Sequence, residues 1–201
     1  MADPTPTQFV NDWLQAFGGA ITRGDYAAVV DMFDADCYWR DMVSFTWNLK
    51  TMEGKDAIGA FLAATMPAAK PSNWQVLGDA THADGVHEAW ITFETAQARG
   101  KGQLRLKAGK AWTLLTTMQE LKGFEERKGG SRPKGVEHGA FAERKNWLER
   151  KTEEEATLGF KTQPYVVIVG GGQGGIVLGA RLKKLGVPAI IVEKNAKPGD
   201  S

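Results

Sequence analysis

A glycine-rich turn directly follows a run of β-branched residues in the C-terminal part of the sequence. Gly170, Gly172 and Gly175 occupy the glycine positions of a G-x-G-x-x-G pattern, with Gln173 and Gly174 before the last of them. The first glycine of such a turn allows a tight bend, the second lets the backbone approach a pyrophosphate, and the third lets a helix pack closely on its strand. The unpaired N–H groups at the start of the next helix favour an anion. The spacing therefore predicts a phosphate-binding turn.

The residues on both sides of the turn can position it. The run 165–169 is typical of a buried parallel strand, and Ile176–Leu185 can form a helix that Gly186 ends in a left-handed conformation. Residues 189–192 predict a second buried strand, and Glu193 follows it, 23 residues after the first glycine, near the roughly 20 expected for a ribose-binding acid. A carboxylate there accepts hydrogen bonds from ribose hydroxyls and repels a 2′-phosphate. This predicts a βαβ unit that binds FAD or NAD rather than NADP.

Residues 164–201 resemble the FAD-binding start of flavin-containing monooxygenases, above all the bacterial and fungal subgroup with an additional amino-terminal domain. The resemblance rests on the motif from Pro164 to Gly175 and on the stretch from Val192 to the Pro-Gly-Asp-Ser end. It implies an FAD-dependent oxidoreductase that oxygenates a small organic substrate, with FAD held by Gly170, Gly172, Gln173, Gly174, Gly175 and Glu193. In that family a second motif binds NADPH, and these residues contain no counterpart of it. The resemblance therefore implies a chain that is inactive as a monooxygenase on its own.

The overall composition is that of an ordinary globular protein. Hydrophobic residues make up 42% of the chain and charged residues 24%, and the formal net charge is +1, so a nucleic-acid partner is not expected. A single cysteine, Cys37, excludes an intramolecular disulfide and a cysteine-based zinc site. We expect neither a secretory signal nor a membrane-spanning segment, and therefore a cytoplasmic protein.

The first 121 residues favour helices followed by a sheet. Apolar residues recur at helical spacing between Phe9 and Phe17, and Asp25 is a suitable N-cap for a second helix at Tyr26–Phe33. Aromatic and β-branched residues predict a strand over Cys37–Phe45, and a helix is expected from residue 54 to about 66. Four more strands are expected after that helix, over Trp74–Gly78, Val86–Thr95, Leu104–Lys107 and Ala111–Leu121. Turns are expected at 84–85, 99–102 and 109–110. The order indicates an α+β domain in which one antiparallel sheet curls over helices.

The segment from Gly24 to Asp41 resembles the nuclear-transport-factor-2-like, or SnoaL-like, cone fold, and the resemblance covers about residues 7–121. It implies a domain that can bind a ligand or form a homodimer. We expect this domain over residues 1–121, a linker with a helix (Ala140–Leu158) over 122–163, and the start of a Rossmann-type FAD-binding domain over 164–201. The monooxygenase subgroup has a domain of this kind before its flavin domain.

Few residues of the first domain have types that could do chemistry. Arg40 and Asp41 are adjacent on a predicted strand, so their side chains point to opposite faces, and a buried Asp41 could act as a general base. An ion-paired or solvated pair is the more ordinary interpretation. The histidines, at positions 82, 87 and 138, have no metal-ligand spacing, and Cys37 lacks a neighbouring base. We therefore assign no catalytic residue and no metal site.

Two further functions fit the sequence. The chain could be part of an NAD-dependent oxidoreductase, because Glu193 suits NAD as well as FAD. The cone domain could also be a non-catalytic module for ligand binding or dimerisation. All seven tryptophans, at positions 13, 39, 47, 74, 90, 112 and 147, precede residue 150, and they fit either core packing or an aromatic pocket for a flat ligand. A free-standing isomerase or dehydratase is disfavoured by the scarcity of acids and bases.

Overall fold

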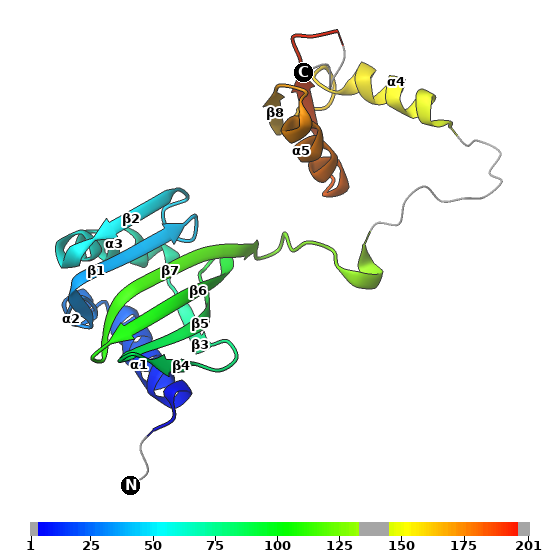
Figure 1. Ribbon diagram of the computed structural model, residues 1–201. Coiled ribbons are helices and arrows are strands. Elements are labelled where there is room, and N and C mark those ends of the chain that lie inside the picture. The colour runs from blue at the N-terminus through cyan, green and yellow to red at the C-terminus, as the bar shows by residue number, and fades with distance from the viewer. Residues whose placement is uncertain (1–3, 133–144, 197–201) are drawn as a thin grey trace. The chain divides into compact units, whose positions relative to one another are not determined.

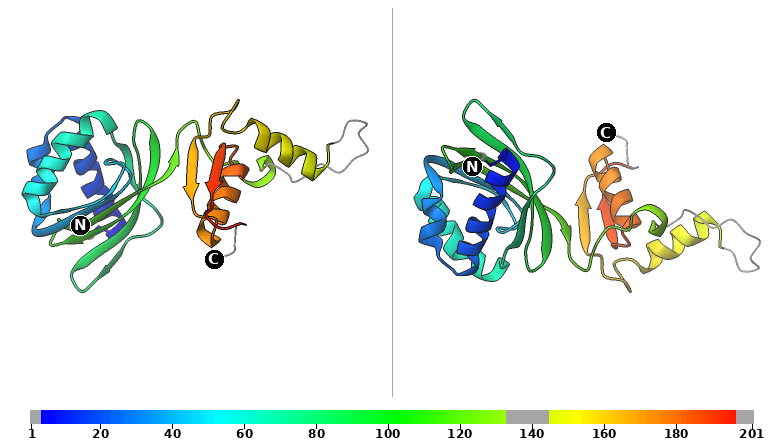
Figure 2. Two further views of the ribbon diagram at one scale, coloured as in Figure 1. Left: turned by 90° about the horizontal axis from the view of Figure 1, so that it is seen from above. Right: turned by 90° about the horizontal axis from the view of Figure 1, so that it is seen from below.

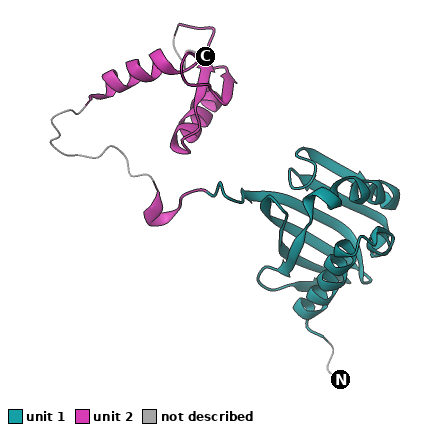
Figure 3. Cartoon of the chain, turned by 180° about the vertical axis from the view of Figure 1, so that it is seen from behind, with its two compact units in different colours: residues 1–125 teal, residues 126–201 magenta. Residues whose placement is uncertain are grey.

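The computed structural model describes residues 4–132 and 145–196. The chain forms two compact units, residues 1–125 and residues 126–201, which are coloured separately in Figure 3. Each unit has its own secondary structure and is described by itself.

The first unit consists of helices packed on a curved sheet (Figure 1). Its helices are α1 (Pro6–Thr22), α2 (Tyr26–Asp31) and α3 (Gly54–Ala69). Its strands are β1 (Phe33–Met42), β2 (Leu49–Glu53), β3 (Ser72–Val76), β4 (Thr81–Ala83), β5 (Val86–Glu94), β6 (Ala98–Lys107) and β7 (Lys110–Leu121). The strand order is β2-β1-β7-β6-β5-β3, with β4 beside β5. This confirms an α+β domain with a curved sheet and helices, consistent with the predicted cone fold.

The sheet is mixed, and the prediction of a purely antiparallel sheet was wrong. Strands β1 and β7 run parallel, with Trp39 opposite Leu114 and Met42 opposite Thr117. This pairing joins the first strand of the domain to the last. No local turn links the two strands, so the sequence pattern gave no signal for their direction.

The predicted turn at residues 99–102 was also wrong, because these residues lie within strand β6. A Cβ atom on Gly100 would lie 2.2 Å from the Phe93 ring, and one on Gly102 would lie 2.2 Å from the backbone oxygen of Leu115. The two glycines therefore allow close packing inside the sheet and do not form a turn. The sequence did not predict the two short strands β2 and β4, which pair with β1 and β5.

The helices of the first unit begin where the sequence provides caps. The Thr5 hydroxyl accepts a hydrogen bond from the Gln8 N–H at 3.2 Å, and the Asp25 carboxylate accepts one from the Ala28 N–H at 3.1 Å. The second of these was the predicted N-cap. Helices α1 and α3 contact the sheet through β3 and β1, and together with α2 they cover one of its faces (Figure 2).

The core between the helices and the sheet is rich in aromatic rings. Trp39 is fully buried, and its ring centroid lies 4.9 Å from that of Phe61. Trp74 stacks on Phe93 at 4.7 Å, and Phe93 stacks on Phe45 at 5.5 Å. These separations are those of touching rings.

The second unit contains α4 (Trp147–Thr157), β8 (Val166–Val169), α5 (Gln173–Lys184) and β9 (Ala189–Val192), after a short 3₁₀ turn at Gly129–Ser131. Strands β8 and β9 are parallel, in register from Val166 opposite Ala189 to Val169 opposite Val192. The predicted order of strand, helix and strand is therefore present. Gly186 follows the end of α5 with φ of +72°, the left-handed conformation expected there.

The predicted connecting helix is shorter than expected where the structure describes it. Helix α4 begins at Trp147 with a capping box, in which the Asn146 side chain accepts from the Glu149 N–H and the Glu149 carboxylate accepts from the Asn146 N–H. Residues 140–144 of the prediction lie outside the described residues. None of the helices in the described parts of the chain is long and apolar enough to cross a lipid bilayer.

Candidate functional site

The glycine turn lies at the carboxyl end of β8. Gly170 has φ of +102°, which favours glycine, and its N–H donates to the Val192 carbonyl oxygen at 2.8 Å. A Cβ atom on Gly175 would lie 2.0 Å from the carbonyl oxygen of Gly170. The third glycine of the pattern is therefore required for α5 to start this close to the turn, as its position in the motif predicted.

Helix α5 presents its N-terminus at this turn. Gly172 is the N-cap residue and no side chain caps the helix. The first intrahelical bond is donated by the Ile176 N–H to the Gly172 carbonyl oxygen at 3.0 Å, so the N–H groups of Gln173, Gly174 and Gly175 have no acceptor within the helix. Gln173 and Gly174 are exposed, and a Cβ atom on Gly174 would meet no atom within 4 Å. Free N–H groups at the positive end of a helix dipole can bind a phosphate.

Glu193, at the end of β9, reaches back to the glycine turn. Its Oε2 atom accepts a hydrogen bond from the Gly171 N–H at 2.5 Å, and its Oε1 atom accepts one from the Asn195 N–H at 2.8 Å. These bonds, that from Asn195 above all, hold the pKa of Glu193 below its ordinary value of 4.5. The turn after β8 and the acid after β9 therefore form one site.

The structure brings together all the residues that the sequence predicted for this site: Gly170, Gly172, Gln173, Gly174, Gly175 and Glu193. The roles of Gly171 and Asn195 were missed. Both act through backbone N–H groups, which every residue except proline has, so residue type carries no signal for them. The Pro-Gly-Asp-Ser stretch of the resemblance falls in residues 198–201, outside the described residues.

The arrangement fits the adenosine diphosphate part of a dinucleotide. The helix N-terminus offers N–H donors that an anion can accept, the three motif glycines (Gly170, Gly172 and Gly175) place no side chain at the turn, and the Glu193 carboxylate beside them offers acceptors for hydroxyl groups. In open α/β sheets ligands bind beyond the carboxyl ends of the strands, which is where these groups lie.

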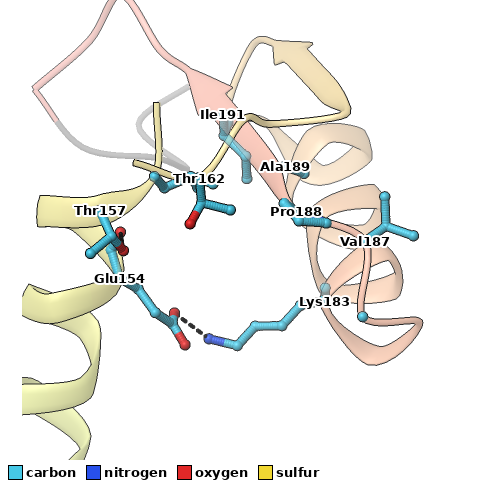
Figure 4. Close-up of a pocket in the computed structure, with 12 residues that line it drawn as sticks. Glu154, Thr157, Thr162, Lys183, Val187, Pro188, Ala189 and Ile191 are labelled. Carbon is cyan, nitrogen blue, oxygen red and sulfur yellow. Dashed lines mark hydrogen bonds and ion pairs between the residues drawn. The ribbon is translucent and has the colours of Figure 1, made fainter. Parts of the chain in front are cut away.

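A cavity of about 500 Å³ elsewhere in the second unit does not belong to this site (Figure 4). It lies between α4 and α5 at the start of β9, where Pro188 and Ala189 line it. The Glu154 carboxylate and the Lys183 ammonium group meet across one side of it at 2.9 Å. It is therefore at the opposite end of β9 from Glu193.

Asp41, the candidate base of the first unit, has a structural role. It is fully buried, and its carboxylate accepts hydrogen bonds from the N–H groups of Ser44, Phe45 and Thr46 and from the hydroxyls of Thr46 and Thr116 at 2.7–3.2 Å. Five donors occupy the oxygens that a general base would need. Arg40 lies on the other face, exposed, with its guanidinium bonded to the Thr51 hydroxyl, so the predicted separation of the pair is confirmed.

Among the described residues, His82, His87 and Cys37 do not form a reactive group. His82 and His87 stack on each other with centroids 4.0 Å apart, and His138 lies outside the described residues. Burial raises the pKa of the Cys37 thiol, which keeps it protonated. Within residues 4–132 and 145–196, no group of three or more His, Cys, Asp or Glu side chains is placed to hold a metal ion.

Comparisons with known proteins give little beyond the fold. No protein-family model matches the sequence, and no curated protein sequence matches it. Solved structures match part of the chain at low identity. One match is the orange carotenoid protein of Anabaena (Nostoc) sp. PCC 7120, whose structure was solved with the protein binding canthaxanthin. It is 18% identical, with a TM-score of 0.42, and the match covers 54% of this chain and 36% of that one.

Two further matches cover almost all of the other protein. Rv0760c of Mycobacterium tuberculosis is 14% identical with a TM-score of 0.43, over 58% of this chain and 92% of that one. An NTF2-like protein of unknown function from Cytophaga hutchinsonii is 12% identical with a TM-score of 0.37, over 59% of this chain and 93% of that one. At these TM-scores the likeness carries no inference about a ligand or an activity of this chain.

Proposed function

We propose that the second unit binds the adenosine diphosphate part of FAD. In this proposal the N-terminus of α5 and the glycine turn, residues 170–175, hold the pyrophosphate, and Glu193 accepts hydrogen bonds from the adenosine ribose. The observation that carries the proposal is the 2.5 Å bond between Glu193 and Gly171, which joins the acid and the turn in one site. Gly175, with no room for a Cβ atom, supports it.

Glu193 suits the unmodified ribose of FAD and of NAD alike, and its negative charge disfavours the 2′-phosphate of NADP. The resemblance of residues 164–201 to flavin-containing monooxygenases favours FAD, and NAD is the alternative. An NADPH site belongs to the proposal only through that resemblance.

The wider proposal is an oxidoreductase of the monooxygenase type that acts on a small organic substrate. Bound FAD supplies the redox chemistry at its isoalloxazine ring. The residues described here bind and orient the adenosine end of the cofactor and exclude side chains from the pyrophosphate. None of them is given a catalytic role.

A second candidate function concerns the first unit by itself. We propose that it is a non-catalytic module for dimerisation or ligand binding. The saturated hydrogen bonding of Asp41 favours a non-catalytic role, because donors already occupy the oxygens of the one candidate base of this unit. Size-exclusion chromatography with light scattering tests the dimer, and a monomer that binds no small ligand would rule the module out.

Titration of the purified chain with FAD, NAD and NADP tests the cofactor proposal. FAD binding is followed by flavin fluorescence, and the two nicotinamide dinucleotides are followed by calorimetry. We expect saturable binding of FAD, weaker binding of NAD and the weakest binding of NADP. A preference for NAD would replace the flavin assignment with the dehydrogenase alternative. A folded chain that binds none of the three would overturn the proposal.

A further inference from the structure

The two hydrogen bonds of Glu193 have a consequence for the site beyond ribose binding. Gly171 is buried, so its N–H requires an acceptor within the protein, and Glu193 Oε2 supplies it at 2.5 Å. The other oxygen, Oε1, accepts a hydrogen bond at 2.8 Å from the N–H of Asn195, which lies in the segment that follows β9. The carboxylate is thus held from both sides by backbone.

We propose that Glu193 is a positioning residue that fastens the glycine turn to the end of β9 and so fixes the ribose acceptor in place before a cofactor arrives. The inference rests on the proposed dinucleotide function. It adds to that function a mechanism of selection against a 2′-phosphate, in which the discriminating side chain also holds the turn together.

Hydrogen-bonding capacity leaves room for both tasks. An ionised carboxylate offers about four lone-pair sites, and the Gly171 and Asn195 amides use two of them. Two sites remain for the two hydroxyls of an adenosine ribose. The amides also favour the ionised form, which lowers the pKa of Glu193, so the acceptor keeps its charge to a lower pH than it would without these bonds.

A carboxylate held in this way cannot turn aside for a larger ligand. Rotation of Glu193 away from a 2′-phosphate would leave the buried Gly171 N–H without an acceptor, and an unsatisfied buried donor is costly. Selection is therefore enforced by the turn as well as by charge repulsion. If the acid contacted only the ribose, its replacement would remove the repulsion of a 2′-phosphate and would improve binding of 2′-phosphorylated ligands. Here removal should weaken binding of both kinds of ligand, because the turn loses its attachment.

The test uses the full chain labelled with ¹⁵N, as the wild type and as Glu193→Ala, Glu193→Gln and Glu154→Gln. The last variant is the matched control, because Glu154 pairs with Lys183 within the same unit, away from the turn. Two quantities are measured: hydrogen exchange of the Gly171 amide without ligand, and the dissociation constants for ADP-ribose and for 2′-phospho-ADP-ribose.

We expect Glu193→Ala to speed exchange of the Gly171 amide and to weaken ADP-ribose binding by about tenfold or more, as for the loss of a charge-assisted hydrogen bond. Binding of 2′-phospho-ADP-ribose should not improve. Glu193→Gln, which keeps the side-chain length and one acceptor oxygen, should show smaller changes in the same direction and keeps the test valid if the alanine variant does not fold. The control should match the wild type.

Unchanged Gly171 exchange in both Glu193 variants would overturn the inference, as would tighter binding of 2′-phospho-ADP-ribose by Glu193→Ala. Failure of the proposed function looks different. In that case the wild type would not bind ADP-ribose, while Gly171 exchange would still show whether Glu193 fastens the turn.

Discussion

Replacement of Asp41 by alanine should destabilise the first unit strongly. Three of the five donors to this carboxylate are buried: the N–H groups of Ser44 and Phe45 and the Thr116 hydroxyl. A buried donor left without an acceptor costs about 1–3 kcal/mol. The donors on Thr46 are only partly buried, so water can replace the carboxylate there. Before any relaxation of the loop, the loss should therefore be about 3 kcal/mol, at about 1 kcal/mol or more for each buried donor.

The loop that Asp41 holds stores backbone strain, and release of this strain would offset part of the cost. Val43 and Trp47 have φ values of +58° and +54°, which are unfavourable for residues with a side chain. Backbone strain of this kind persists only where surrounding interactions fix it, at a cost of about 1–3 kcal/mol for each residue. Without the carboxylate the loop can relax and recover some of this strain. The buried hydrogen bond from the Trp39 Nε1–H to the Thr116 hydroxyl should weaken, which is a further loss, so we expect a net destabilisation.

Urea unfolding followed by tryptophan fluorescence measures the effect. Trp147 is the only tryptophan outside residues 1–125, so the signal reports mainly on the first unit. Asp41→Asn keeps the shape and one acceptor oxygen, and it should lose less stability than Asp41→Ala. Asp79→Ala, at an exposed position, is the control and should stay within about 0.5 kcal/mol of the wild type.

A loss below about 1 kcal/mol in Asp41→Ala would refute the structural assignment. A gain in stability would be stronger evidence against it, because replacement of a catalytic residue held in unfavourable surroundings often stabilises a protein.

Three further predictions concern stability. Gly102→Ala should destabilise the first unit by about 1–3 kcal/mol, since its Cβ would lie 2.2 Å from a backbone oxygen of β7; urea unfolding measures this, and an unchanged midpoint would contradict it. The Arg99 guanidinium donates to the Glu125 carboxylate at 2.8 Å and lowers the pKa of Glu125 to about 2. The ion pair should therefore contribute its full stability to the folded state above about pH 4.5, and this contribution should be lost as the pH falls towards 2. Glu125→Gln should abolish that part of the pH dependence of unfolding. Burial and the neighbouring His82 lower the pKa of His87, so the folded state binds fewer protons and stability falls as the pH drops below 6.5. An NMR titration that places the pKa of His87 at or above 6.5 would contradict this.

The sequence predicted best what depends on neighbouring residues. The N-cap Asp25, the left-handed Gly186 and the βαβ order around the glycine turn are local features, and the structure contains all three. The turn could be identified because Gly170, with φ of +102°, and Gly175, whose Cβ would lie 2.0 Å from the Gly170 carbonyl oxygen, meet conformational and steric needs within a few residues.

Features that depend on distant partners escaped prediction. The parallel pairing of β1 with β7 and the bond from the Thr116 hydroxyl to Asp41, 75 residues apart, have no local signal. Gly100 was assigned to a turn because a turn glycine and a glycine that makes room for a ring on the adjacent strand cannot be distinguished by residue type. Strands β2 and β4 are short and mostly exposed, so they lack an alternating apolar pattern.

Calorimetric titration with FAD of the wild type, Gly175→Ala and Gly174→Ala tests the central claim most directly. The two variants add the same methyl group one residue apart. On Gly175 its carbon would lie 2.0 Å from the Gly170 carbonyl oxygen, and on Gly174 it would meet no atom within 4 Å. The account predicts saturable binding by the wild type and by Gly174→Ala, and none by Gly175→Ala. Equal FAD binding by all three proteins, or binding by none, would contradict it.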